Sequence, residues 1–314
     1  MKIEPDRWRG TAMRDLLEAH FDSVADVQPL SGGLFSRAYA FLAGGREYVI
    51  RINAEEHAAE SFAKDDYAWR HFASEELPIP RVVAVGEHED WHYAISERAP
   101  GRTLMECSPE ERRAALPALL DTLEAIGKVN TRASTGYGDW GGDGNGGYGS
   151  WQEFLAAIIE NHDAGYFANW HRYFEDSFLE RDVFERVYER MLRLAERCPN
   201  MRKLVHNDYQ FENVLADGER ISGVIDWANA LYGDPLYDVA WLGWISTHPG
   251  WWFDEGMEIL RARFGDAPDF DVRIACCELH IGLDHFRFYA RNDRYDDYRL
   301  CRDWLLARIG HGPG

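Results

Sequence analysis

Residues 204–240 read LVHNDYQFENVLADGERISGVIDWANALYGDPLYDVA, and this stretch decides the fold. It opens with the pattern H-x-D-x-x-x-x-N over His206 to Asn213. Two short apolar runs follow within residues 214–225, separated by the turn pair Asp217-Gly218, which predicts a β-hairpin. Asp226 comes directly after the second run, so the hairpin returns this carboxylate to the end of the first pattern.

The spacing of that first pattern is the spacing of a kinase catalytic loop. In that geometry Asp208 faces the hydroxyl that receives phosphate, and Asn213 turns back toward a metal ion. A carboxylate at a strand end, such as Asp226, can bind a Mg²⁺ ion that bridges phosphates. An isolated pattern of this kind is more often turn chemistry. Here the hairpin and the second aspartate follow in the order that phosphoryl transfer requires, so we predict that Asp208 is catalytic and that Asn213 and Asp226 bind metal.

The same stretch predicts how the loop is held. Gly233-Asp234-Pro235 precedes an apolar run, so Asp234 is expected to cap a helix with Pro235 in its first turn. Asp238 then follows one turn later, where its carboxylate can point back at the backbone of the catalytic loop.

Upstream, the first hundred residues predict one helix followed mostly by strands. Thr11 can cap a helix whose apolar positions Met13, Leu16, Leu17 and Phe21 share one face. Glycine pairs then separate short β-rich runs, as in an antiparallel sheet with tight turns. The predicted strands are 24–30, 36–42, 46–52, 81–86 and 91–97, with a helix at about 59–73.

Beyond Pro100-Gly101 the pattern becomes mainly helical. Ser108 and Ser150 each begin a capping box. Residues 136–149 contain two overlapping G-x-G-x-x-G patterns, but neither follows a strand and opens a helix, so we interpret this segment as a flexible surface loop. The fold class is therefore α+β with two lobes, a small antiparallel β-sheet lobe over residues 1–99 and a mainly α-helical lobe over residues 100–314.

Net charge and hydropathy indicate which kinds of binding partner the chain favours. The chain has 314 residues and a formal net charge of −20. This charge disfavours nucleic acid and favours a cationic ligand, although a well-solvated acidic surface would give the same count. No apolar run approaches the ~18 residues of a membrane helix, and the first residues lack a signal-peptide core. We therefore expect a cytoplasmic protein that does not associate with a membrane.

The cysteines and histidines do not indicate a metal site. Five cysteines form no C-x-x-C pattern, so we expect buried thiols rather than a disulfide framework or a zinc site. His280 and Asp284, one helical turn apart, are more typical of a structural pair than of metal ligands.

The quoted stretch resembles the signature of the aminoglycoside phosphotransferases, which have a bilobal protein-kinase-like fold. Four further segments, FDSVADVQPLSGG, GREYVIRIN, YAWRHFASEELPIP and IGLDH, resemble the hygromycin phosphotransferase branch of that family. The similarity runs from about residue 14 to 290 with the order preserved. One departure lies at residues 209–212, which are bulkier than those common at the outer edge of the family's catalytic loop.

The resemblance implies a nucleotide site in the first lobe. Ser31, Gly32, Gly33 and Ser36 match the loop that positions the nucleotide. Arg51 stands where the family usually has its phosphate-binding lysine, and Asp65 stands where a carboxylate orients that cation. The stretch 95–101 resembles the hinge between lobes, where the carbonyl of Ser96 and the N–H of Arg98 would meet the nucleobase. A solvated helix face remains the alternative for Asp65.

These features imply an ATP- and Mg²⁺-dependent transfer of phosphate to a hydroxyl of an aminoglycoside, with Asp284 as the substrate-binding carboxylate. An ordinary solvated acid on an amphipathic helix is the alternative for Asp284. Two other functions remain open: a kinase of the same fold for another hydroxylated metabolite or peptide antibiotic, and a nucleotide-binding pseudokinase. Intact Asp208, Asn213 and Asp226 argue against the last. Either a monomer or a homodimer is compatible with the sequence.

Overall fold

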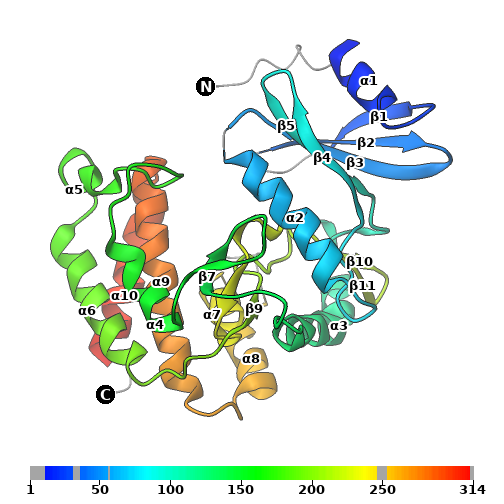
Figure 1. Ribbon diagram of the computed structural model, residues 1–314. Helices are drawn as coiled ribbons and strands as arrows, with labels where there is room; N and C mark the ends of the chain where they lie inside the picture. Colours follow the sequence, from blue (N-terminus) through cyan, green and yellow to red (C-terminus); the bar gives the residue numbers. More distant parts are fainter. Residues whose placement is uncertain (1–10, 31–35, 56, 246–252, 312–314) are drawn as a thin grey trace.

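The N-terminal lobe is built on a five-stranded antiparallel sheet (Figure 1). The computed structural model describes residues 11–30, 36–55, 57–245 and 253–311. The strands lie in the order β1-β2-β3-β5-β4, and each predicted strand is present within two residues at either end. Their bounds are β1 (Ala25–Leu30), β2 (Arg37–Ala43), β3 (Arg46–Asn53), β4 (Val82–His88) and β5 (Trp91–Glu97).

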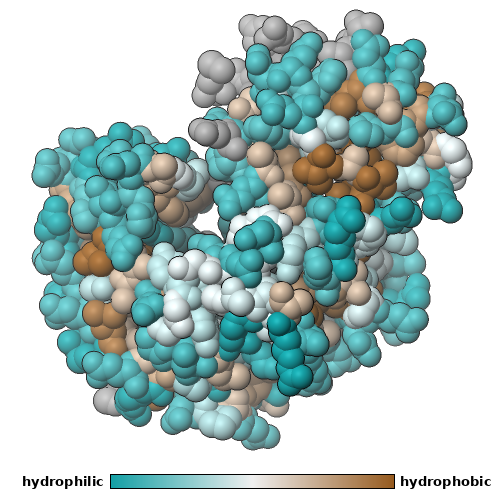
Figure 2. Space-filling model, in the orientation of Figure 1, coloured by the Kyte–Doolittle hydropathy of each residue, from teal (hydrophilic) through white to brown (hydrophobic). Residues whose placement is uncertain are grey.

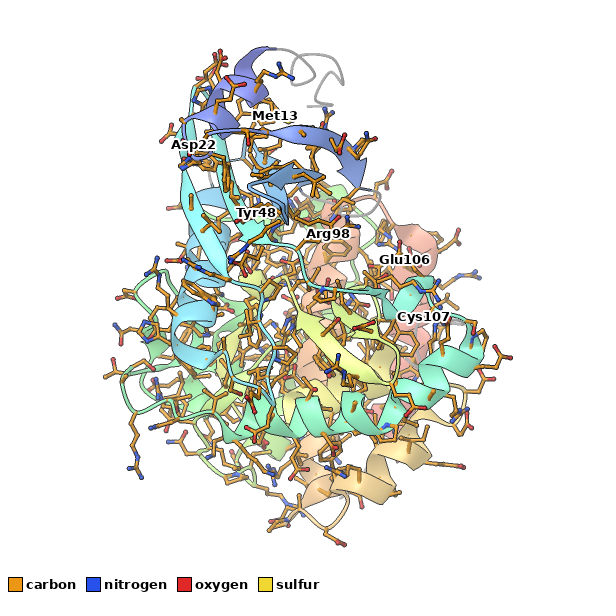
Figure 3. The ribbon with its side chains drawn as sticks, turned by 90° about the vertical axis from the view of Figure 1, so that its right-hand side faces the viewer. Met13, Asp22, Tyr48, Arg98, Glu106 and Cys107 are labelled. Carbon is orange, nitrogen blue, oxygen red and sulfur yellow. The ribbon has the colours of Figure 1, made fainter. Side chains whose placement is uncertain are left out.

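Two helices cover opposite faces of this sheet, α1 (Thr11–Glu18) and α2 (Ala58–Phe72). Met13, labelled in Figure 3, belongs to the apolar cluster between α1 and the sheet, together with Ile50 and Ile52 of β3. Because side chains alternate along a strand, Arg51 points to the other face, where its guanidinium lies 5.3 Å from the ring centre of Phe62 on α2. The sheet therefore directs this cation at α2.

The C-terminal lobe is mainly helical, as predicted. Its longest helix, α9, packs against α6, α7 and α10 in the core of the lobe (Figure 1). The α-helices are α3 (Pro109–Lys128), α4 (Trp151–Ala156), α5 (Tyr173–Asp176), α6 (Arg181–Ala195), α7 (Leu236–Ile245), α8 (Gly256–Phe264), α9 (Phe270–Arg291) and α10 (Tyr295–His311). Four short 3₁₀ helices are also described: η1 (Leu104–Glu106), η2 (Ala157–Ile159), η3 (Trp170–Arg172) and η4 (Trp227–Asn229).

One of the two predicted capping boxes is complete. At Ser108 the hydroxyl accepts from the N–H of Glu111, and the Glu111 carboxylate accepts from the N–H of Ser108. Ser150 accepts from the N–H of Glu153, but that glutamate accepts from the N–H of Gly149, so the second box is only half formed.

Two small sheets carry the quoted stretch. The first, in the order β11-β10-β6, contains the predicted hairpin, and the second has the order β8-β7-β12-β9. The strands are β6 (Arg102–Thr103), β7 (Tyr137–Trp140), β8 (Gly146–Tyr148), β9 (Lys203–Val205), β10 (Val214–Asp217), β11 (Arg220–Val224) and β12 (Leu231–Gly233). Residues 206–213 thus connect β9 to β10, and residues 225–230 connect β11 to β12, so both segments run between the two sheets.

The glycine-rich segment is not the flexible loop that we predicted. Its residues form the β7–β8 hairpin, which packs against α2. Gly144 has φ +77°, and a Cβ at this position would collide with the ring of Tyr67 on α2. Glycine is required here because a helix side chain lies directly on the backbone.

Other expectations concern buried and apolar groups. All five cysteines are buried as free thiols, as predicted. No helix within the described ranges is both long and apolar enough to cross a membrane. His280 accepts or donates a hydrogen bond of 2.8 Å with the hydroxyl of Tyr237. The lobe boundary between residues 99 and 100 stays a prediction.

A buried ion pair fixes α7 against α9. The guanidinium of Arg273 makes two hydrogen bonds, of 2.6 and 2.7 Å, to the carboxylate of Asp234, which is fully buried. The same carboxylate accepts from the N–H of Leu236, the predicted cap, although Pro235 lies just before the first helical residue. The pair was not predicted because its members are 39 residues apart.

We predict that Arg273→Met lowers the free energy of unfolding by about 3–5 kcal/mol, because it leaves the Asp234 carboxylate buried without a counter-charge. Adding Asp234→Asn to this variant should recover part of the loss. Urea denaturation measures both. Arg299→Met, whose side chain is 53% exposed, is the matched control and should change stability by less than about 0.5 kcal/mol. An equal, small effect of both single variants would contradict the prediction.

Candidate active site

The start of the catalytic loop is held by Asp238 of α7, as predicted. Its two carboxylate oxygens accept from the N–H groups of His206 and Asn207, at 2.8 and 2.7 Å. Asn207 has φ +60°, a backbone conformation that asparagine tolerates better than most residues. Burial raises the pKa of Asp238 to about 7, and the two hydrogen bonds oppose that rise. The helix therefore fixes the turn that precedes Asp208.

His206 joins the catalytic loop to the segment that carries Asp226. Burial lowers the pKa of His206 to about 4, so the ring is neutral at pH 7. Its Nε2 lies 3.0 Å from the carbonyl oxygen of Ile225, and a neutral ring must donate this hydrogen bond from Nε2. The bond keeps the two connecting segments side by side.

Asp208 lies at the centre of the loop with both carboxylate oxygens oriented. Oδ1 accepts from the amide of Gln210 and Oδ2 accepts from the amide of Asn213, each at 2.8 Å. Burial raises the pKa of Asp208 well above its ordinary value, and the nearby carboxylate of Asp226 adds to the rise. A carboxylate that is desolvated and fixed by two donors is pre-oriented toward an acceptor hydroxyl.

Asn213 and Asp226 come together as predicted. The N–H of Ile225 donates to the carbonyl of Asn213 at 3.0 Å, which brings Asp226 next to the loop's end. Because the amide nitrogen of Asn213 binds Asp208, its oxygen is the atom that can be offered to a cation. An amide oxygen and a carboxylate, completed by phosphate oxygens and water, are a donor set that suits Mg²⁺. Among the described residues, no cluster of three or more His, Cys, Asp or Glu side chains could hold a metal by itself.

Asp226 is half-buried and lies near the charges of Arg51 and Asp65. It has φ +64° and ψ +66° at the start of η4. Burial raises the pKa of Asp226, Arg51 lowers it and Asp65 raises it, with a net shift upward. A divalent cation at this carboxylate would remove the cost of burying its charge.

The predicted ion pair between Arg51 and Asp65 is present. Asp65 is buried, and its two oxygens have different partners: Oδ2 binds the guanidinium of Arg51, while Oδ1 accepts from the N–H of Trp227 at 2.9 Å. Burial lowers the pKa of Arg51, but Asp65 and Asp226 outweigh it and raise it. The alternative of a solvated helix face at Asp65 is therefore wrong, and the phosphate-binding role of Arg51 stays a prediction.

The predicted nucleobase contacts at the hinge need correction. The N–H of Arg98 donates to the carbonyl of Glu47 at 3.0 Å, so it is used within the sheet. Ser96 lies opposite Val49 in the β3–β5 register, and the alternation of an antiparallel pair directs its backbone groups to the same side. The pairing of β3 with β5 extends past the strand end that we took as the hinge. Figure 3 shows Arg98 between Tyr48 of the sheet and Cys107 of the other lobe.

The structure adds little on the other residues of the predicted nucleotide-positioning loop. Ser31, Gly32 and Gly33 lie outside the described residues. Ser36 is described, half-buried, immediately before β2.

Three of the four bulky residues of the catalytic loop, at positions 209–211, are buried. Tyr209 is fully buried, and its hydroxyl donates to the carbonyl of Leu119 on α3 at 2.8 Å. Phe211 is also buried, beneath the guanidinium of Arg112. These two side chains anchor the loop in the core, and of the four residues that depart from the family pattern only Glu212 is exposed.

Asp284 lies on α9, where Arg287 binds it at 2.5 Å and its side chain is 43% exposed. Burial raises the pKa of Asp284, but Arg287, His285 and His280 together outweigh burial and lower it. The carboxylate interacts electrostatically with Asp139 of β7, which in turn interacts with Lys64 of α2. Asp284 thus interacts electrostatically with a residue that also interacts with α2. Its role as a substrate ligand stays a prediction.

Sequence reasoning missed three residues of this region: Gln210, Asp139 and Lys64. Gln210 was visible only as part of the loop. Asp139 lay in the segment interpreted as a loop, and Lys64 sat in a predicted helix without any motif. Figure 2 shows a hollow between the two lobes. Lys64 of α2 and Asp284 of α9 each interact electrostatically with Asp139 of β7.

The comparisons with known proteins agree with this geometry. A sequence model of the phosphotransferase enzyme family (APH) matches residues 26–273. The chain is 40% identical to hygromycin-B 4-O-kinase of Escherichia coli over 309 residues, covering 97% of this chain and 86% of that protein. It is 28% identical to homoserine kinase of Methylobacillus flagellatus over 223 residues, covering 69% of this chain and 62% of that protein.

Solved structures give the same result. A crystal structure of a thermostable mutant of aminoglycoside phosphotransferase APH(4)-Ia, in ternary complex with ADP and hygromycin B, has a TM-score of 0.84 and 34% identity, covering 97% of this chain and all of that one. A ternary complex of a related mutant with AMP-PNP and hygromycin B has a TM-score of 0.86. The α+β bilobal fold and the family resemblance are therefore confirmed, and the chain belongs to the phosphotransferase enzyme family.

Proposed function

We propose that this protein transfers the γ-phosphoryl group of ATP to a hydroxyl of a hygromycin-like aminoglycoside. The observation that carries the proposal is the assembly around Asp208. Its carboxylate is held by Asn213, and Asp226 and the Arg51–Asp65 pair lie beside it. Phosphoryl transfer needs an oriented nucleophile and fixed positive charge around the phosphates, and little other chemistry from the protein.

Each group has a part in this reaction. Asp208 orients the acceptor hydroxyl and takes its proton. Asn213 and Asp226 would hold Mg²⁺, which would supply positive charge against the phosphates. Arg51 contacts phosphate oxygens in a fork geometry, and Asp65 keeps its guanidinium in place.

The aminoglycoside substrate is favoured by relatives and by charge. Hygromycin B is the substrate in the name of the Escherichia coli relative and is bound in the structures with the two TM-scores above. An aminoglycoside carries several ammonium groups, and this chain has a net charge of −20. Acidic side chains such as Asp284 would attract such a substrate.

A second candidate is a kinase for another small hydroxylated metabolite. It is favoured by the match to homoserine kinase, whose coverage and identity are lower. We expect the protein to act in the cytoplasm, where ATP is present, as a monomer or a homodimer. Nucleic acid and membranes have no part in this function.

We predict that hygromycin B is phosphorylated faster than homoserine or choline when each is offered with Mg·ATP. Mass spectrometry of the products, which should be heavier by one phosphoryl group, and coupled ADP release both measure this. A polycationic acceptor should also show a KM that rises with salt, because the attraction is screened. Phosphorylation of homoserine with no transfer to any aminoglycoside would favour the second candidate.

We predict that Asp208→Asn lowers kcat by roughly 10²- to 10⁴-fold, the usual contribution of a positioned base, while the Kd for Mg·ATP changes little. The amide keeps the size of the side chain, so the fold should persist. Glu219→Gln, in the exposed turn of the β10–β11 hairpin, is the control and should keep kcat within a few-fold of the native value. A kcat for Asp208→Asn near that of the control would exclude Asp208 as the base.

We predict that Arg51→Ala raises the KM for ATP and lowers kcat, because the fixed cation beside the phosphates is lost. Arg51→Lys should keep part of the activity through its charge and lose the part that needs two parallel hydrogen bonds. Steady-state kinetics at saturating acceptor separate the two effects. Arg46→Ala, at the exposed start of the same strand, is the control. If Arg51→Ala and Arg46→Ala have the same kinetics, Arg51 does not bind phosphate.

A further inference from the structure

Lys64 of α2 is a buried cation that no motif explains. It is one of four lysines in the chain and is 4% exposed. Its Nζ donates to the carbonyl of Ala230 at 2.9 Å and lies 4.9 Å from the ring centre of Trp140. The carboxylate of Asp139 is its largest electrostatic partner.

Burying the Lys64 ammonium group in this way is not explained by stability alone. An ammonium group buried with one carbonyl acceptor and an aromatic face still carries a desolvation cost, and burial lowers the pKa of Lys64. Replacing a buried ion pair by apolar side chains is often neutral or stabilising, and only a buried counter-charge left alone is costly. Asp139, the main electrostatic partner of Lys64, is exposed to solvent, so an apolar residue at position 64 would leave no such charge there. A lysine at this position therefore indicates a role that an apolar residue could not fill.

The partners of Lys64 and its neighbour show what that role is. Lys64 and Asp65 are adjacent on α2, and both bind the short segment that begins at Asp226. Asp65 accepts from the N–H of Trp227 at 2.9 Å, near the start of the segment. Lys64 donates to the carbonyl of Ala230, at its end. The segment is therefore clamped at two points by one helix of the other lobe.

The same helix also orients Arg51, because Asp65 binds its guanidinium. Any shift of α2 would move the partner of Arg51 and release the segment of Asp226 together. We propose that Lys64 is a positioning residue for phosphoryl transfer, which locks α2 against residues 226–230 so that the phosphate-binding cation and the metal-binding carboxylate are placed at once. This inference rests on the roles proposed above for Arg51 and Asp226.

The test compares Lys64→Met with the native protein. Three quantities are measured: the melting temperature, kcat with hygromycin B, and the ratio of the Kd for ADP without Mg²⁺ to the Kd with Mg²⁺. We expect the melting temperature to stay the same or rise, kcat to fall by about 10- to 100-fold, as expected for misplaced reacting groups, and the Mg²⁺-dependent ratio to fall. Lys128→Met, an exposed lysine on α3, is the matched control and should change none of the three.

A competing explanation is that Lys64 only compensates the charge of Asp139. The double variant Lys64→Met/Asp139→Asn separates the two ideas. If the clamp matters, the double variant keeps the low kcat and the low Mg²⁺-dependent ratio. If it regains native values of both, Lys64 serves Asp139 alone and the proposal is overturned.

Two further outcomes are decisive. Native kcat and a native Mg²⁺-dependent ratio in Lys64→Met overturn the proposal. If Lys64→Met does not fold, Lys64→Gln, which keeps a polar donor, is measured in the same way, and failure of both to fold assigns the lysine to stability and overturns the proposal. Asp226→Asn is measured alongside: an unchanged ratio there contradicts the metal-binding role of Asp226 itself, independently of Lys64.

Discussion

The active-site arrangement depends on one carboxylate that binds groups in both lobes. Asp65 gives one oxygen to Arg51 in the N-terminal sheet and the other to the backbone of Trp227 in the C-terminal lobe. Because both partners bind the same rigid group, the distance between the cation and the segment of Asp226 is set by the width of a carboxylate. Helix α2 carries this group, and the β7–β8 hairpin supports the helix by packing Gly144 against Tyr67 and Gly142 against Ala63.

Much of this could be predicted from sequence because the signals are local. The hairpin of β10 and β11 follows from a turn pair between two apolar runs, and the hydrogen bonds of Asp238 follow from its place in the first turn of α7. The family resemblance added Arg51 and Asp65, which are 14 residues apart and lie on different elements. Spacing alone could not have paired them, since their contact depends on how α2 packs on the sheet.

The predictions that the structure corrected failed for one physical reason, which is that contacts between distant parts of the chain decided the outcome. The N–H of Arg98 is used by Glu47 because two strands continue pairing past a turn signal. Tyr209 turns inward because α3 offers a carbonyl beneath the loop. We predicted a flexible loop for the glycine-rich segment because glycine is common both in turns and where another group packs closely on the backbone. Only the contact with helix α2 distinguishes the two. Lys64 had no signal, since its acceptor lies 166 residues away.

The guanidinium at residue 51 also has a consequence for chemical profiling of nucleotide-binding proteins. Probes that carry an acylating group on a nucleotide phosphate label a primary amine held beside the phosphates. In the function proposed above that place is taken by the guanidinium of Arg51, which stays protonated and does not acylate readily. The buried Lys64 has its amine bonded to the Ala230 carbonyl. A survey that detects kinases through such amine labelling would therefore pass over this protein even when its nucleotide site is fully occupied.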